Sequence, residues 1–160
     1  MNTILVGMGD LNVCKHPDSL KTLALGSCVG IALYDPLTKV SGLAHIMLPD
    51  STLIKKNSNK AKFADTAIKL MIDNMIQIGA SKRRIVAKLA GGAQMFSISG
   101  DSELMNIGSQ NEVAARKNLM NHGIRIIASD CGKNYGRTVV LYSETGILEV
   151  KSIGKQLNHI

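Results

Sequence analysis

Aromatic residues are scarce in this sequence of 160 residues, which contains no tryptophan, two phenylalanines and three tyrosines. Aliphatic side chains and eight methionines must therefore fill most of the core. No apolar run approaches the length of a membrane-spanning helix. Residues 1–10 also lack the basic start and the sustained apolar run of a secretory signal. These absences predict a soluble cytoplasmic protein without direct insertion into a membrane.

Cysteine occurs at only three positions, 14, 28 and 131, which is an odd number without C-x-x-C spacing. This usage argues against both a disulfide framework and a thiolate zinc site. Cys14 and His16 have C-x-H spacing, but two ligands without further partners make a poor zinc site. We therefore expect a reducing compartment and neither a metal nor an organic cofactor.

Acidic residues are outnumbered, with 12 Asp and Glu against 19 Lys and Arg, which gives a formal net charge of +7. This balance suits an acidic partner, whether nucleic acid, anionic lipid or an acidic protein surface, and charge alone does not choose among them. The basic residues are dispersed, few aromatic rings are available to stack on bases, and no nucleic-acid-binding motif is recognised. We expect solvated basic faces and no nucleic acid partner.

The chain shows neither internal repeats nor a linker rich in proline, glycine or serine, and its length is typical of one domain. We therefore expect a single domain spanning residues 1–160. Residues 22–48 are aliphatic on both alternating faces, which is typical of strands covered on two sides. Other apolar segments predict further strands at residues 84–89, 125–128, 138–142 and 147–151.

Two segments predict helices. Apolar residues at helical spacing indicate a helix over residues 59–78 that ends at Gly79. A second helix is expected to start near Ser109, which forms a capping box with Glu112, and to end at Gly123. The strands cluster toward the two ends of the sequence and do not alternate with the helices. We therefore expect an α+β fold in which layered, sandwich-like mixed β-sheets are flanked by the two helices.

A turn at residues 35–38 is expected to join two apolar strands into a hairpin, because proline is preset for the second position of a turn. If Asp35 pairs with Thr38, Cys28 lies directly opposite His45, with Cβ atoms about 5 Å apart. A four-residue loop would place the two side chains diagonally on one face. A three-residue loop would place them on opposite faces. Two of the three registers thus bring a thiol and an imidazole together.

A cysteine beside a histidine suits nucleophilic acyl transfer, because the imidazole can take the thiol proton and leave a more nucleophilic thiolate. Gly26 and Ser27 precede Cys28 where the strand register is expected to break, and their backbone amides are candidate donors to a developing oxyanion. The alternative is an inert core residue, which is the usual role of a cysteine in an aliphatic strand. The residues alone leave both interpretations open.

Five segments carry a resemblance to a known family: TLALGSCVGIALYDP at 22–36, GLAHIMLP at 42–49, AGGAQMF at 90–96, IGSQN at 107–111 and NYGRTVVLYSETGILEV at 134–150. Together they span most of the chain and resemble the CheD family of chemoreceptor glutamine deamidases. The resemblance implies a catalytic triad at Cys28, His45 and Thr22. It also implies a fold similar to the catalytic domain of cytotoxic necrotizing toxins.

The activity implied by this resemblance is hydrolysis of selected glutamine side chains of methyl-accepting chemotaxis receptors to glutamate. The implied partners are the cytoplasmic domains of those receptors, with a CheC-type phosphatase as a further candidate. Two positions depart from the expected family pattern: Gln110 replaces a basic residue in IGxRN, and Cys131 replaces a glycine. Neither position belongs to the implied triad. The alternative function is a non-catalytic chemotaxis adaptor that binds receptors and a CheC-type phosphatase.

Overall fold

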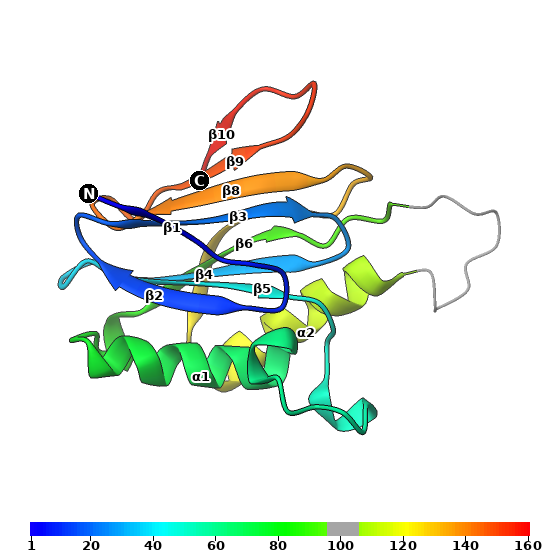
Figure 1. Cartoon of the computed structure of the whole chain (residues 1–160), viewed down its shortest axis with the longest axis horizontal. Coiled ribbons are helices and arrows are strands. Elements are labelled where there is room, and N and C mark those ends of the chain that lie inside the picture. The colour runs from blue at the N-terminus through cyan, green and yellow to red at the C-terminus, as the bar shows by residue number, and fades with distance from the viewer. Residues whose placement is uncertain (96–105) are drawn as a thin grey trace.

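The computed structural model describes residues 1–95 and 106–160, and these form three layers (Figure 1). Two five-stranded sheets stack on each other, and both α-helices cover the outer face of one of them. The layered α+β architecture predicted from the sequence is therefore confirmed. No helix among these residues is long and apolar enough to cross a membrane.

Each sheet is mixed, with one parallel strand pair among antiparallel ones. The first sheet contains, in spatial order, β1 (Thr3–Leu5), β3 (Ser19–Leu25), β8 (Arg137–Tyr142), β9 (Leu148–Lys151) and β10 (Asn158–His159). The second sheet contains β2 (Leu11–Lys15), β5 (Val40–Ile46), β4 (Val29–Asp35), β6 (Val86–Gly91) and β7 (Arg125–Cys131). The parallel pairs are β1 with β3 and β6 with β7.

The second sheet is the middle layer, so its central strands are covered on both faces. Every residue of β4 and β5 is buried, as their continuous aliphatic sequences predicted. One core lies between this sheet and the helices α1 (Ala64–Gln77) and α2 (Ile107–Asn121). A second core lies between the two sheets and includes Cys28 and Leu43. The segments that contain Cys28 and His45 therefore lie inside the molecule.

The first helix is shorter at its start than the sequence predicted. Asn59 does not begin it but caps the short 3₁₀ turn Lys60–Lys62, accepting a hydrogen bond from the Ala61 N–H at 3.2 Å. Phe63 is then extended, and α1 begins at Ala64. The predicted end is confirmed, because Gly79 follows the helix with a φ of +117° that favours glycine.

The second helix begins two residues earlier than predicted, and the expected capping box is wrong. Its N-cap is Asn106, with no side-chain capping hydrogen bond, and Ser109 lies inside the first turn. Packing sets this start, because Gly108 approaches the backbone so closely that a Cβ would lie 2.6 Å from the Gly92 carbonyl oxygen. The end before Gly123 is confirmed.

The later strands agree with the predictions, but two boundaries differ. β6 begins at Val86 and not at residue 84, because Lys82–Arg84 form a 3₁₀ turn. β6 also includes Gly91, and β7 continues to Cys131 because it pairs with β6 along its whole length. β8 and β9 match the predicted segments to within one residue.

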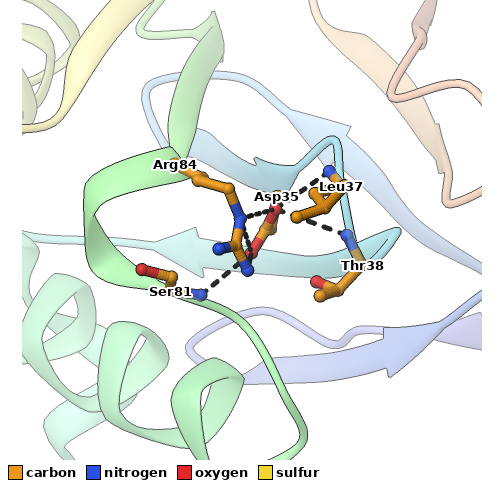
Figure 2. Close-up of polar contacts among 5 residues, drawn as sticks. All are labelled: Asp35, Leu37, Thr38, Ser81 and Arg84. Carbon is orange, nitrogen blue, oxygen red and sulfur yellow. Dashed lines mark hydrogen bonds and ion pairs between the residues drawn. The ribbon is translucent and has the colours of Figure 1, made fainter.

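A buried carboxylate fastens the end of the β4–β5 hairpin to the segment before β6 (Figure 2). Asp35 is fully buried, and Nη2 of Arg84 lies 2.9 Å from its Oδ2. The backbone N–H groups of Ser81 and Leu37 donate to the same carboxylate at 2.9 and 3.0 Å. Burial raises the pKa of Asp35, but the hydrogen bonds from Arg84 and the two amides outweigh that effect and hold its pKa below the ordinary range.

Replacing Asp35 with asparagine is expected to lower the free energy of unfolding at pH 7 by about 1 to 3 kcal/mol, because several donors lose a charged acceptor. The lowered pKa means that the contribution is complete above the unfolded carboxyl value of about 4 and is lost as the pH falls through the folded value. Denaturant unfolding as a function of pH measures both effects. Asp73→Asn is the control, since its ion pair with Lys69 is exposed. Equal midpoints for wild type and Asp35→Asn at neutral pH would contradict this role.

Candidate active site

The three residues of the predicted triad come from different parts of the fold. Thr22 lies on β3 of the first sheet, and His45 lies on β5 of the second. Cys28 lies in the connection between β3 and β4, one residue before β4 begins. All three are buried, with exposed fractions of 0%, 1% and 8% for Thr22, His45 and Cys28. The candidate site therefore lies between the two sheets.

The hairpin register differs from the simplest prediction. Asp35 pairs with Val40, so the loop has four residues, and His45 stands opposite Gly30 and not opposite Cys28. The loop closes through a hydrogen bond from the Lys39 N–H to the Asp35 carbonyl at 2.9 Å, with Lys39 at a φ of +55°. Direct opposition is thus wrong, and the diagonal arrangement of the four-residue alternative is the observed one.

A short hydrogen bond with Thr22 determines which nitrogen of the neutral His45 ring carries the proton. Thr22 Oγ1 donates to the Val6 carbonyl oxygen at 2.7 Å, so its single proton is already used. The same Oγ1 lies 2.7 Å from Nδ1 of His45 and must accept a hydrogen there. In the neutral imidazole, Nδ1 therefore carries the proton and Nε2 carries the lone pair. Nε2 is buried and has no hydrogen-bond partner within the described residues.

Burial favours the neutral forms of both reactive groups. It raises the pKa of the Cys28 thiol and lowers the pKa of the His45 imidazole. No hydrogen bond joins the two side chains in the part of the chain that the structure describes. Burial therefore favours a thiol and a neutral imidazole over a thiolate and imidazolium pair.

The first four residues of the AGGAQMF motif, AGGA at 90–93, hold the Cys28 connection in place. The N–H of Gly92 donates to the Cys28 carbonyl and that of Ala93 donates to the Gly26 carbonyl, both at 2.8 Å. Gly91 has a φ of +100°, and a Cβ there would collide with the Cys28 carbonyl oxygen. These glycines thus allow close backbone contact beside the cysteine. Phe96, the last residue of this motif, lies outside the described residues.

The expected break in register before Cys28 is present. β3 shifts its pairing with β8 between Thr22 and Leu25, and Ala24 has a φ of +58°. The N–H of Gly26 donates to the Ala24 carbonyl at 3.1 Å, so this amide is already engaged. For the N–H groups of Ser27 and Cys28, the described residues show no acceptor. These two amides remain candidate donors to an oxyanion.

Comparison with known proteins shows which family this chain belongs to. The family model "CheD chemotactic sensory transduction" matches residues 47–152. Relatives that match nearly the whole chain are about half identical to it. The chain belongs to the CheD family. The matched region begins after His45, so it contains none of the three predicted triad positions.

The CheD relatives share one name. The protein from Caldanaerobacter subterraneus subsp. tengcongensis is 55% identical over 155 residues, covering 97% of this chain and 96% of the relative. The protein from Lachnoclostridium phytofermentans is 53% identical over 152 residues, covering 95% and 94%. That from Clostridium novyi is 48% identical over 157 residues, covering 98% and 97%. Each is named a probable chemoreceptor glutamine deamidase CheD.

Sequence reasoning missed one buried polar residue of this CheD chain, Asn111 on α2. Its Nδ2 donates to the carbonyl oxygens of Ser27 at 2.9 Å and Met47 at 3.0 Å. The sequence signal was present, because Asn111 falls in the buried stripe of the helix with Gly108, Ala115 and Leu119. A polar residue in such a stripe is expected to have a specific partner.

The other two cysteines and His159 are not members of the predicted triad. Cys14 is buried with its Sγ 3.2 Å from the Ser143 hydroxyl. Cys131 is half-buried on β7, and burial, followed by the charge of Glu112, raises its pKa to about 12. His159 lies in β10. No group of three or more potential metal-binding side chains occurs among the residues described.

Proposed function

We propose that this CheD protein is a cysteine-dependent protein-glutamine deamidase that converts selected glutamine side chains of methyl-accepting chemotaxis receptors to glutamate. The observation that carries the proposal is the Thr22–His45 hydrogen bond, which leaves the Nε2 lone pair of His45 inside a site that also contains a buried cysteine. The names of the relatives supply the substrate class.

In the first step, Nε2 of His45 takes the proton of the Cys28 thiol as the sulfur attacks the glutamine carboxamide carbon. A sulfur–carbon bond forms and the carbonyl oxygen becomes negatively charged. The N–H groups of Ser27 and Cys28 are the donors that we assign to this oxyanion. Thr22 accepts from Nδ1 throughout, so it keeps the ring oriented while Nε2 gains and loses its proton.

In the second step, the imidazolium gives its proton to the departing nitrogen, the carbon–nitrogen bond breaks, and ammonia leaves a thioester on Cys28. Water then attacks the thioester after losing a proton to Nε2. The resulting tetrahedral intermediate breaks its carbon–sulfur bond to give glutamate, and Nε2 returns the proton to the Cys28 sulfur. Every proton transfer uses Nε2 of His45.

The closed site favours a side-chain substrate over a backbone peptide bond. The Cys28 side chain is only 8% exposed, and the Met95 side chain approaches Gly26 so closely that a Cβ there would lie 3.3 Å from it. A scissile peptide bond has polypeptide on both sides and needs an open groove. A glutamine carboxamide is the tip of a flexible chain and can enter a narrow opening.

The direct test is incubation of the protein with a receptor cytoplasmic fragment, followed by peptide mass spectrometry. We expect amide-to-acid conversion at a few glutamines, with other glutamines of the same fragment unchanged. Heat-denatured protein is the control for spontaneous deamidation. Receptor binding without conversion would instead support the adaptor function, with a CheC-type phosphatase as the second partner to test.

A further inference from the structure

Asn111 links the two segments that carry the proposed nucleophile and base. It is fully buried, and its Nδ2 donates to the Ser27 and Met47 carbonyl oxygens. Ser27 directly precedes Cys28, and Met47 follows His45 by two residues. One side-chain amide on α2 therefore reaches both segments.

The orientation of this amide is determined by its partners. Both partners are carbonyl oxygens, which only accept hydrogen bonds, so the nitrogen and not the oxygen must face them. Each of its two hydrogens is then used once. The Oδ1 atom of Asn111 is left buried without a partner among the described residues, which carries a desolvation cost.

The place of the contact is also informative. The ladder between β4 and β5 ends at the pair Val29 and Ile46. Ser27 and Met47 lie beyond that last pair, where no further residue pair of the ladder connects the two strands. Asn111 supplies the missing connection at the level of Cys28.

The helix that carries Asn111 is itself fixed against the cysteine connection. Gly108 packs on the Gly92 and Ala93 carbonyls with no room for a Cβ. Gly92 in turn donates to the Cys28 carbonyl at 2.8 Å. The Nδ2 of Asn111 is therefore held in a defined position relative to Cys28.

We propose that Asn111 is a positioning residue that keeps Cys28 in register with His45, so that Nε2 can take the thiol proton. This inference rests on the proposed Cys28 and His45 chemistry but not on the identity of the substrate. Among the described residues, Asn111 makes no hydrogen bond to the Cys28 sulfur or to Nε2 of His45. It acts through the backbone on both sides of the pair.

The test uses alkylation of Cys28 by iodoacetamide, followed by peptide mass spectrometry, which needs no receptor. Asn111→Asp keeps the shape but places a carboxylate against two carbonyl oxygens. We expect it to slow Cys28 alkylation at neutral pH by about tenfold, because small displacements of a reacting pair have large effects on rate. His45→Ala is expected to slow alkylation by a similar factor. Asn118→Asp is the matched control, since Asn118 lies on the same helix and donates to the Ala114 carbonyl.

Three results would overturn the proposal. Wild-type alkylation rates in folded Asn111→Asp would show that the contact does not position the thiol. A normal rate in Asn111→Ser, made if the aspartate variant is unfolded, would show the same. Failure of both variants to fold would make the role structural. Alkylation of buried Cys14 in the same sample reports global unfolding.

The receptor assay separates this inference from the proposed function. We expect Asn111→Asp to reduce kcat for deamidation by about 10- to 100-fold with KM changed less than about threefold, because binding contacts are kept. If wild type converts no receptor glutamine but shows His45-dependent and Asn111-dependent alkylation, the receptor activity fails and the positioning role stands.

Discussion

Replacing Cys28 with alanine is expected to reduce the rate of receptor deamidation by at least about 10⁴-fold, because the nucleophile that forms the thioester is removed. Alanine fills most of the volume of cysteine, so the fold should be retained. The measurement is the time course of amide-to-acid conversion by mass spectrometry, with the thermal unfolding midpoint measured on the same preparation.

Cys131→Ala is the matched control for this substitution. Cys131 is also a partly buried cysteine, but burial raises its pKa to about 12 and it lies on β7, outside the triad. Its removal should leave the rate within about twofold of wild type, because Cys131 supplies neither the proposed nucleophile nor the proposed base. Conversion by Cys28→Ala at the wild-type rate would exclude the thioester mechanism.

Replacing His45 with alanine is expected to cost nearly as much as replacing Cys28, because the thiol then has no base. The double variant Cys28→Ala/His45→Ala should be no slower than either single variant, since residues that act as a unit give non-additive effects. Steady-state rates of the four proteins test this. His122→Ala is the control, since His122 caps the end of α2 away from the site.

The same histidine predicts the pH dependence of the wild-type enzyme. Only neutral His45 can accept the thiol proton, so kcat/KM should fall in acid as His45 becomes protonated. Because burial lowers the pKa of His45, this fall is expected below the ordinary imidazole value of about 6.5. An acid limb above that value would contradict a buried neutral base.

Local sequence patterns predicted the layers of this fold and the β4–β5 hairpin, but did not choose among its possible registers. Asp35 and Pro36 indicated the hairpin, and the aliphatic residues on both faces of β4 and β5 indicated burial on two sides. The loop length depended on Lys39 adopting a left-handed φ, which a lysine rarely does and no local pattern announced. The observed pairing of Asp35 with Val40 differs by two residues from the predicted pairing of Asp35 with Thr38.

Contacts between distant segments were the features that the sequence could not supply. The Ser109 and Glu112 pair has the spacing of a capping box, but packing of Gly108 on the AGGA segment overrides it. The role of Asn111 depends on carbonyl groups 84 and 64 residues away. Thr22 was predicted from the resemblance alone, because a threonine on a strand is ordinary until its partner is known.

The division of the triad between two sheets has a consequence for how the proposed chemistry is confined. The base on β5 is oriented by a hydroxyl on β3, and these strands belong to different layers. If the layers separate, the imidazole loses the contact that selects its tautomer. A partly unfolded chain is then a poor catalyst, even though its thiol is more accessible. The proposed activity would therefore be confined to the folded sandwich.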